Sequence, residues 1–180
     1  MKNQIVVQID SSFFTLHSSF KKLNDMNNVE LMRRAIALSE ESVMCGGGPF
    51  GAVIAKDGKI VAEACNMVVP SNDPTAHAEI SAIRKAAHAL GSFDLTGCEI
   101  YTSCEPCPMC LGAIYWAHLD KVYWANGRKD AAKAGFDDDF IYKEMSLSPS
   151  QRTLPSEVIL PDEAIKAFEM WKEKGDKVEY

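Results

Sequence analysis

Thr102-Ser103-Cys104-Glu105-Pro106-Cys107-Pro108-Met109-Cys110 is the stretch around which this chain is organised. About thirty residues earlier lies its counterpart, Pro74-Thr75-Ala76-His77-Ala78-Glu79. Cys107 and Cys110 are three residues apart, so in the first turn of a helix their thiolates lie on one face and can bind one ion. His77 would be a third ligand. Three protein ligands leave a fourth tetrahedral position for water, which distinguishes a catalytic metal site from a closed structural one.

Together the two stretches give H-x-E followed by P-C-x-x-C, a pattern typical of zinc-dependent deaminases. We therefore predict that His77, Cys107 and Cys110 bind one Zn²⁺ ion per subunit, and that Glu79 moves protons without binding the metal. A single histidine is usually an ordinary one, and an isolated C-x-x-C is often a redox pair or half of a structural site. The joint presence of all four residues at these spacings disfavours both alternatives.

Cys104 offers a rival arrangement within the same stretch. It continues the spacing of three set by Cys107 and Cys110, and as a fourth ligand it would fill the position needed by water. However, Cys104 precedes Glu105-Pro106, and the residue before a proline is extended rather than helical. We therefore expect Cys104 at the end of a strand, away from the helical face that holds the other two thiols.

The proposed chemistry is hydrolytic deamination of a ring that carries an amine. Zinc would lower the pKa of water toward about 7. Glu79 would take the proton from that water and pass it to a ring nitrogen beside the attacked carbon. The same carboxyl group would then protonate the departing amine. The sequence thus predicts a hydrolase, with water and a small-molecule base as its substrates.

The composition argues for a single domain that does not bind nucleic acid. The chain has 180 residues, which is long enough to bury a sizeable core, and a net charge of −6. Binding to a phosphate backbone would need a basic patch, whereas lysine and arginine occur in scattered pairs such as Arg33-Arg34 and Arg84-Lys85. No apolar run approaches the roughly 20 residues that span a bilayer, so we expect no membrane partner.

The cysteines and the first residues bear on location and domain organisation. Three of the six cysteines lie at successive spacings of three, which suits a metal site better than a disulfide framework. Residues 1–25 lack the basic start and long apolar core of a signal peptide, and we expect a cytoplasmic protein. We expect residues 1–25 to be a poorly ordered extension, or to precede a true start at Met26, and residues 26–180 to form the catalytic domain.

The pattern of the remaining chain predicts an α/β fold. Asn27 and Glu30 form a capping-box signal for a first helix, which Gly46-Gly47-Gly48 would end. Asp57-Gly58 between two apolar runs indicates a hairpin. Strand–helix–strand alternation between residues 76 and 125 favours a sheet with parallel pairing. The predicted elements are strands 51–56, 59–64, 99–102 and 121–125, a loop at 66–75, helices 27–45, 76–90, 106–117 and 162–174, and a short helical piece beyond Gly127.

From about Met26 onward the chain resembles the cytidine-deaminase-like superfamily, and within it the bacterial guanine deaminases. Three of the stretches that carry the resemblance are shared widely among purine-type deaminases. The fourth, which contains Gly-Phe-Asp-Asp, and the terminal Tyr180 point to guanine. The four stretches are Gly47–Val53, Ser71–Glu79, Tyr101–Trp116 and Ala134–Tyr142.

The resemblance implies a three-layer α/β/α sandwich around a mixed, five-stranded sheet. It assigns a second proton-handling role to Asp138, although the run Asp137-Asp138-Asp139 leaves Asp137 as the alternative. It implies a homodimer with domain swapping, in which the C-terminal segment crosses over and Tyr180 closes the partner's pocket. The residues that it places against the substrate are Phe50, Asn66, Ala78, Trp116 and Tyr180.

The chemistry of these residues is compatible with guanine. Guanine presents two donors side by side, N1–H and the C2 amine, and a carboxylate such as that of Asp138 can accept both. Adenine and cytosine place an acceptor beside the amine, which a carboxylate would repel. Asn66 can donate and accept, so it suits O6 or a ring nitrogen. Aromatic faces at Phe50 and Trp116 suit stacking on a purine.

Several alternatives use the same scaffold. A guanosine deaminase would need room for a ribose at N9. A tRNA adenosine deaminase would need a basic face, whereas the last predicted helix carries both charges. A cytosine or cytidine deaminase fits the purine-type surroundings less well. A non-catalytic zinc-binding subunit of a larger complex would be expected to have lost the carboxylate at Glu79, which is present.

Overall fold

The structure is a computed structural model that describes residues 25–179. The predicted extension of residues 1–25 lies outside that range except for Asp25, so it stays a prediction. Asp25 and Met26 attach to the hairpin: Asp25 Oδ1 is 3.8 Å from Lys59 Nζ, and the Met26 N–H donates to the carbonyl of Gly58 at 2.8 Å. The described chain therefore begins on the domain.

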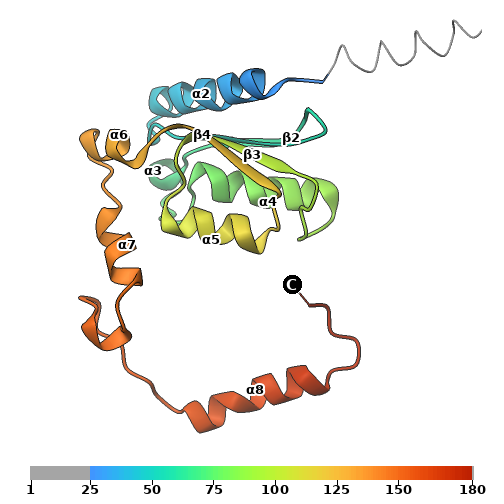
Figure 1. The fold of residues 1–180 in the computed structure, drawn as a ribbon, viewed down its shortest axis with the longest axis vertical. Helices are drawn as coiled ribbons and strands as arrows, with labels where there is room; N and C mark the ends of the chain where they lie inside the picture. The colour runs from blue at the N-terminus through green and yellow to red at the C-terminus, as the bar shows by residue number, and fades with distance from the viewer. Residues whose placement is uncertain (1–24, 180) are drawn as a thin grey trace, which may run out of the picture.

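The elements follow one another as α/β units along the chain (Figure 1). The first half supplies α2, a hairpin, the short α3 and the long α4; the second half supplies two strands and the remaining helices. Their bounds are α2 Asn28–Met44, β1 Gly51–Lys56, β2 Lys59–Cys65, α3 Val68–Ser71, α4 Ala78–Leu90, β3 Glu99–Cys104, α5 Pro108–Trp116, β4 Lys121–Asn126, α6 Arg128–Lys133, α7 Asp139–Met145, a 3₁₀ turn Pro149–Gln151, and α8 Pro161–Glu173.

Local sequence signals determine where the first elements begin and turn. The Asn27 side chain accepts from the backbone N–H groups of Val29 and Glu30, and the Glu30 carboxylate accepts from the Asn27 N–H at 2.8 Å. This capping box starts α2 where the sequence predicts it. Asp57 and Gly58 both have positive φ, of 50° and 74°, as a tight two-residue hairpin requires.

The sheet is mixed and has the strand order β2-β1-β3-β4. β1 pairs antiparallel with β2 and with β3, whereas β3 and β4 are parallel. The carboxyl ends of β2, β3 and β4 therefore meet at one edge of the sheet, together with the start of β1. This edge is where the residues of the candidate site gather.

Helices cover both faces of the sheet, because alternate strand residues point to opposite sides. Val53, Ala55 and Tyr101 pack on one face against α2, as one buried cluster with Leu31 and Ala35. On the other face, a second cluster packs the sheet against α4 and α5. Figure 1 shows α2 in blue on one side of the strands and α4 and α5 in green and yellow on the other. The second cluster contains Ala52, Ile54, Ala62, Ala64, Ala78, Ala82, Ala86, Leu95, Cys98, Ile100, Ile114 and Ala117.

The expected five-stranded sheet was wrong, since the sheet within residues 25–179 has four strands. After β4 the chain passes Gly127 and enters α6, whose sequence Arg-Lys-Asp-Ala-Ala-Lys consists mostly of good helix formers. Two α-helices were not predicted: α3 within the expected loop, and α7 in the segment after Asp138. Both are shorter than two full turns and carry little periodic signal.

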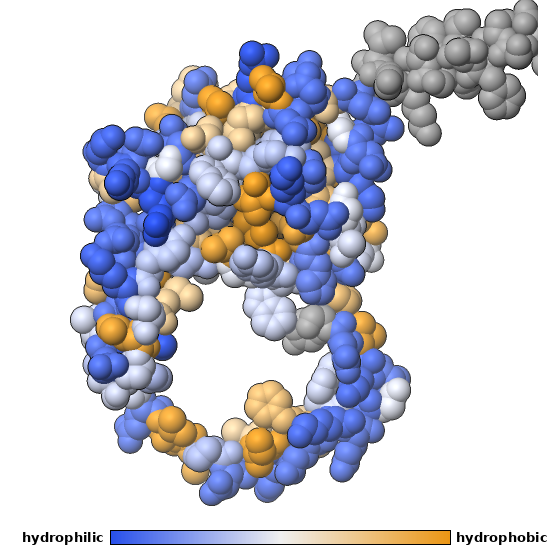
Figure 2. Space-filling model, viewed as in Figure 1, coloured by the Kyte–Doolittle hydropathy of each residue, from blue (hydrophilic) through white to orange (hydrophobic). Residues whose placement is uncertain are grey.

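The C-terminal part forms an arm that leaves the body of the domain (Figure 1). Residues 149–173 are exposed throughout, and α8 buries none of its side chains within this chain. Figure 2 shows orange, apolar side chains on the side of α8 that faces the opening between arm and body. Ile165, Phe168 and Trp171 of α8 are 48%, 66% and 39% exposed. Among residues 25–179 no helix is long and apolar enough to cross a membrane.

Candidate active site

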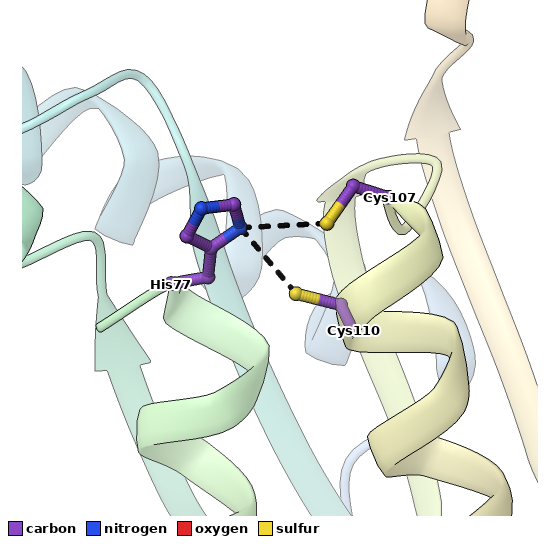
Figure 3. Close-up of side chains that lie close together, drawn as sticks. All are labelled: His77, Cys107 and Cys110. Carbon is purple, nitrogen blue, oxygen red and sulfur yellow. Dashed lines mark hydrogen bonds between the residues drawn. The ribbon is translucent and has the colours of Figure 1, made fainter. Parts of the chain in front are cut away.

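Two helix N-termini meet at the edge of the sheet and bring the predicted metal ligands together. His77 is the N-cap of α4, and Cys107 is the N-cap of α5, with Cys110 in its first turn. His77 Nδ1 lies 3.6 Å from Cys107 Sγ and 3.5 Å from Cys110 Sγ (Figure 3). Within the described residues, these three side chains are also the group whose donor atoms all lie within 4.8 Å of one another.

The donor geometry fits a tetrahedral zinc ion. Zinc binds histidine nitrogen at about 2.0–2.1 Å and cysteine sulfur at about 2.3 Å, so a nitrogen and a sulfur on one tetrahedral ion are roughly 3.5–3.6 Å apart. The two nitrogen–sulfur distances in the structure, 3.6 and 3.5 Å, match that separation. Both thiols stand at the N-terminus of α5, where the helix dipole favours the thiolate. His77, Cys107 and Cys110 are therefore placed to hold one zinc ion.

The two thiols of this site differ in proton affinity. Hydrogen bonds from Cys110 and, to a smaller extent, from His77 lower the pKa of Cys107 to about 4, against the effect of burial. The same bond to Cys107, together with burial, raises the pKa of Cys110. The hydrogen bond with Cys107 raises the pKa of His77. The pair thus favours a thiolate at Cys107, and a bound cation would favour the second thiolate at Cys110.

Cys104 lies apart from the metal ligands, as the sequence predicts. It is the last residue of β3, 7% exposed, and its thiol faces the carbonyl of Gly127 at 3.9 Å. Burial raises the pKa of Cys104 to about 11, so the thiol stays neutral at physiological pH. The fourth position of the metal site is therefore not taken by Cys104.

Glu79 stands in the first turn of α4, two residues after His77, and is 8% exposed. Burial raises the pKa of its carboxyl group, and the charge of Cys107 adds to the rise, while its own backbone N–H opposes it. A carboxyl group with a raised pKa can release and recover a proton nearer neutral pH. Its position beside the three ligands suits the transfer of protons.

A cavity of about 550 Å³ opens beside the three ligands. Its volume falls within the range of about 300–1,000 Å³ usual for small-molecule sites. Of the residues expected at the site from sequence, those that line it are Phe50, Asn66, His77, Glu79, Cys107 and Asp138. Lining residues to which the sequence reasoning gave no role include Val68, Val69, Glu105, Arg128, Phe136 and Ile141.

Three residues expected to contact the substrate are not among those that line the cavity. Ala78 is fully buried behind the ligands, in the core against the sheet. Trp116 is at the end of α5 and 65% exposed. Tyr180 lies outside the described residues. The roles of these three residues stay predictions.

Asn66 is oriented by its neighbours. Its side-chain oxygen accepts from the backbone N–H groups of Gly48, at 3.4 Å, and Val68, at 3.2 Å. A hydrogen bond also holds the backbone of Asn66, whose carbonyl accepts from Ser42 Oγ at 3.1 Å. With the oxygen occupied in this way, Asn66 can offer its amide N–H groups to an acceptor in the cavity.

The neighbouring acidic residues Asp137 and Asp138 differ in burial and in hydrogen bonding. Asp137 and Asp138 both line the cavity, but Asp137 is exposed and its carboxylate accepts from the Asp139 N–H at 3.0 Å. Asp138 is half-buried at the N-cap of α7. Burial raises the pKa of Asp138, the charge of Cys107 adds to the rise, and the charge of Arg128 opposes it.

Comparison with known proteins places the chain in a family. Residues 26–126, which contain all three metal ligands and Glu79, match the cytidine and deoxycytidylate deaminase zinc-binding region. This chain belongs to the cytidine and deoxycytidylate deaminase family. Its zinc site is thus a family feature that the side chains of this chain can form.

Within the deaminase family, the similarity to one guanine deaminase covers the whole length of that enzyme. The guanine deaminase of Bacillus subtilis (strain 168) is 53% identical over 156 residues, covering 86% of this chain and all of that protein. Its crystal structure superposes with a TM-score of 0.83 over 86% of this chain and 99% of that one. A guanine deaminase structure from Nitrosomonas europaea is 27% identical, with a TM-score of 0.61 over 77% of this chain and 79% of that one.

Similarity to tRNA deaminases of the family is narrower. The tRNA-specific adenosine deaminase of Aquifex aeolicus (strain VF5) is 37% identical over 100 residues, which is 56% of this chain and 66% of that protein. The shared part is therefore shorter than for the guanine deaminase of B. subtilis.

Proposed function

We propose that this chain hydrolyses guanine to xanthine and ammonia, using a zinc ion at His77, Cys107 and Cys110. The observation that carries the proposal is the 53% identity to the B. subtilis guanine deaminase over the whole of that protein. The cavity beside the ligands, with Glu79 and the acidic residues on its wall, provides the groups that the reaction needs.

A zinc ion held there would lower the pKa of water and so supply a nucleophile near neutral pH. The carboxyl group of Glu79 takes the proton of that water and delivers it to the ring nitrogen next to C2. It then takes the remaining proton from the hydroxyl group added to C2 and gives it to the amine, which leaves C2 as ammonia. The burial of Glu79, 8% exposed, keeps competing water away from this transfer.

Two further groups would hold the base in register. Asp138 is the better candidate of the acidic run, because it is half-buried, whereas the carboxylate of Asp137 accepts from the chain's own backbone. As a carboxylate it accepts the adjacent donors of guanine. Asn66 offers N–H groups to O6 or a ring nitrogen, since its oxygen is held by the backbone. Phe50 gives the cavity an aromatic wall. The Phe136 ring packs edge-on against the Phe50 ring, with 5.0 Å between the two ring centroids.

The reaction is tested by ammonia release. Pure zinc-loaded protein is incubated separately with guanine, guanosine, adenine, cytosine and cytidine. We expect ammonia from guanine and xanthine as the other product. Faster release from guanosine would instead support a nucleoside deaminase, and release from adenine alone would overturn the assignment. The Glu79→Gln variant, with its zinc content measured, controls for spontaneous hydrolysis and contaminating enzymes.

The proposed enzyme is a homodimer in which the C-terminal arm is exchanged between two copies. An isolated helix of 13 residues, the length of α8, is marginal in water unless its apolar side is packed. α8 keeps Ile165, Phe168 and Trp171 on its surface and buries none of its side chains within its own chain. A second copy offers both the covering surface and, by two-fold symmetry, an identical arm in return.

Complementation between two inactive variants tests the exchange. One variant is Glu79→Gln with an intact C-terminus, and the other keeps Glu79 but lacks residues 175–180. In mixed dimers the first copy can supply its terminal segment to the second copy's pocket. Activity that appears only after the two proteins are unfolded and refolded together supports the exchange. A monomer in solution, or no recovery in verified mixed dimers, contradicts it.

We place the reaction in the cytoplasm. Support comes from the cysteines, all six of which are free thiols in the described residues. Reduced thiols of this kind persist in a reducing compartment.

A further inference from the structure

The segment that carries Asp138 is attached to the body of the domain by side chains. Among the described residues, every backbone–backbone hydrogen bond of residues 128–147 closes within residues 127–147. Asp138 therefore has no backbone ladder that would fix it relative to the metal ligands. One side-chain contact holds the segment between the two helices, since the Phe136 ring packs edge-on against Phe50 with 5.0 Å between the ring centroids. The other contacts reach from α6 and α7 to the turn before Cys107.

Arg128, the first residue of α6, makes two of these attachments to Glu105. Its backbone N–H donates to one oxygen of the Glu105 carboxylate at 3.4 Å. Its Nε lies 3.5 Å from the other oxygen. Because both carboxylate oxygens are engaged, the start of α6 is held against the residue that lies two positions before Cys107.

Tyr142 of α7 completes the connection from the other side of Asp138. The Arg128 guanidinium lies over its ring, 4.2 Å from the ring centroid. The Tyr142 hydroxyl donates to the carbonyl of Pro106 at 3.1 Å. Pro106 immediately precedes Cys107 and is buried. The two helices that flank Asp138 are thus joined to each other through Arg128 and to the metal-ligand turn through Glu105 and Pro106.

These contacts fit a positioning role better than a stabilising one. The side chains of Arg128 and Glu105 are 42% and 32% exposed, and ion pairs at such exposure contribute little to stability. A guanidinium is nevertheless planar, and it can pair with a carboxylate and stack on a ring at the same time, which a lysine ammonium cannot do. Arg128 also lines the cavity, and its charge acts on Asp138.

We propose that Arg128, held by Glu105 and Tyr142, is a positioning residue for the deamination reaction. It holds the Asp138 segment at a fixed place on the cavity wall relative to the metal-ligand turn, so that the acidic group meets the base when Glu79 transfers its proton. This role rests on the proposed function. It assigns work to three residues, Glu105, Arg128 and Tyr142, that the spacing of the metal motif does not include.

A double-mutant cycle tests whether Arg128 acts through Asp138. Arg128→Met is measured alone and in the Asp138→Asn background, with kcat and KM for guanine, zinc per chain and the unfolding midpoint. A displacement of about 1 Å of a reacting group can cost on the order of 100-fold, so we expect Arg128→Met alone to lose about 10- to 100-fold in kcat/KM. In the Asp138→Asn background the same substitution should have little further effect.

Conservative variants and a control separate positioning from structure. Arg128→Lys keeps the charge but loses the planar face, and should recover part of the lost activity. Tyr142→Phe keeps the ring under Arg128 but loses the bond to Pro106, and should lose less than Arg128→Met. Lys129→Met, at an exposed neighbour on the same helix, should match wild type.

Arg128→Met would overturn the positioning role if it lowered kcat/KM equally in the wild-type and Asp138→Asn backgrounds. Wild-type activity of the Arg128→Met protein would also overturn it, and so would a loss of activity that its lower zinc content explains. Failure of the proposed function gives a different result. In that case the wild-type protein releases no ammonia from guanine. The same cycle is then measured on whichever tested base is deaminated, and additive losses there again overturn the role of Arg128.

Discussion

Replacing Glu79 by glutamine isolates the proton-transfer step from metal binding and folding. Glutamine has almost the shape of glutamate, and position 79 is 8% exposed in the first turn of α4, so the packing around it is retained. His77, Cys107 and Cys110 are unchanged, and the zinc site should stay complete. What is lost is a group whose pKa is raised by burial and which can therefore release and regain a proton during turnover.

The size of the effect follows from that role. Positioned general acid–base groups contribute about 10²- to 10⁴-fold, which corresponds to about 2.7–5.4 kcal/mol of barrier. We therefore expect kcat for guanine to fall by that factor. Zinc per chain should equal wild type, and the unfolding midpoint should shift by less than about 4 °C, the equivalent of about 1 kcal/mol for a chain of this size.

The assay follows ammonia from guanine under saturating substrate, with zinc measured on the same sample. Glu40→Gln makes the same chemical change at an exposed position on α2 and should leave both quantities unchanged. A Glu79→Gln protein with full zinc and a rate near wild type would refute the assignment of Glu79. Loss of zinc in the variant would show that Glu79 supports the metal and not only the proton.

Three further substitutions test other parts of the structure. Cys104→Ser should keep one zinc per chain by metal analysis, and a zinc-free variant would make Cys104 a ligand. Arg34→Met removes the ion pairs of Arg34 with Glu63, 2.8 Å between Nε and Oε2, and with Glu41, and should lower the free energy of unfolding in urea by about 1 kcal/mol or less at pH 7. The hydrogen bond with Arg34 lowers the pKa of Glu63 below its ordinary 4.5. The difference in unfolding free energy between wild type and Arg34→Met should therefore vanish as the pH falls through this lowered pKa. A difference that stays constant with pH would exclude the ion pair as its cause. Gly47→Ala places a methyl group against the carbonyl oxygen of Asn66 and should cost about 1–3 kcal/mol of stability and some activity; an unchanged unfolding curve would contradict the close packing.

Local and strongly directional signals are the part of this protein that its sequence predicts well. Asn27 and Glu30 start α2 by a capping box, and Asp57-Gly58 makes the hairpin turn, because each signal acts over two or three residues. The zinc ligands were predictable for another reason. Metal chemistry restricts residue type and spacing, so His77 and the C-x-x-C pair carry their function in the pattern itself.

Contacts between distant residues left no such pattern. Arg128 contacts Glu105, 23 residues away in the sequence, and Tyr142 contacts Pro106, 36 residues away. No periodic spacing in the sequence predicts these contacts. α5 is apolar on all sides, so periodicity could not tell that Ile114 is buried while Trp116 is 65% exposed. The fifth strand was expected from resemblance alone, and within residues 25–179 no strand follows β4.

The metal site connects α4 and α5, and this has a consequence for how the molecule would respond to a chelator. His77 comes from one helix and Cys107 and Cys110 from the other, while the buried residues of α5 are Pro108, Cys110 and Ile114. With the ion removed, the amide hydrogens of α5 should exchange with solvent sooner than those of β1 and β3, whose side chains are almost all buried. Chelation would then act first as local melting of one helix, and the ion would serve the architecture as well as the chemistry.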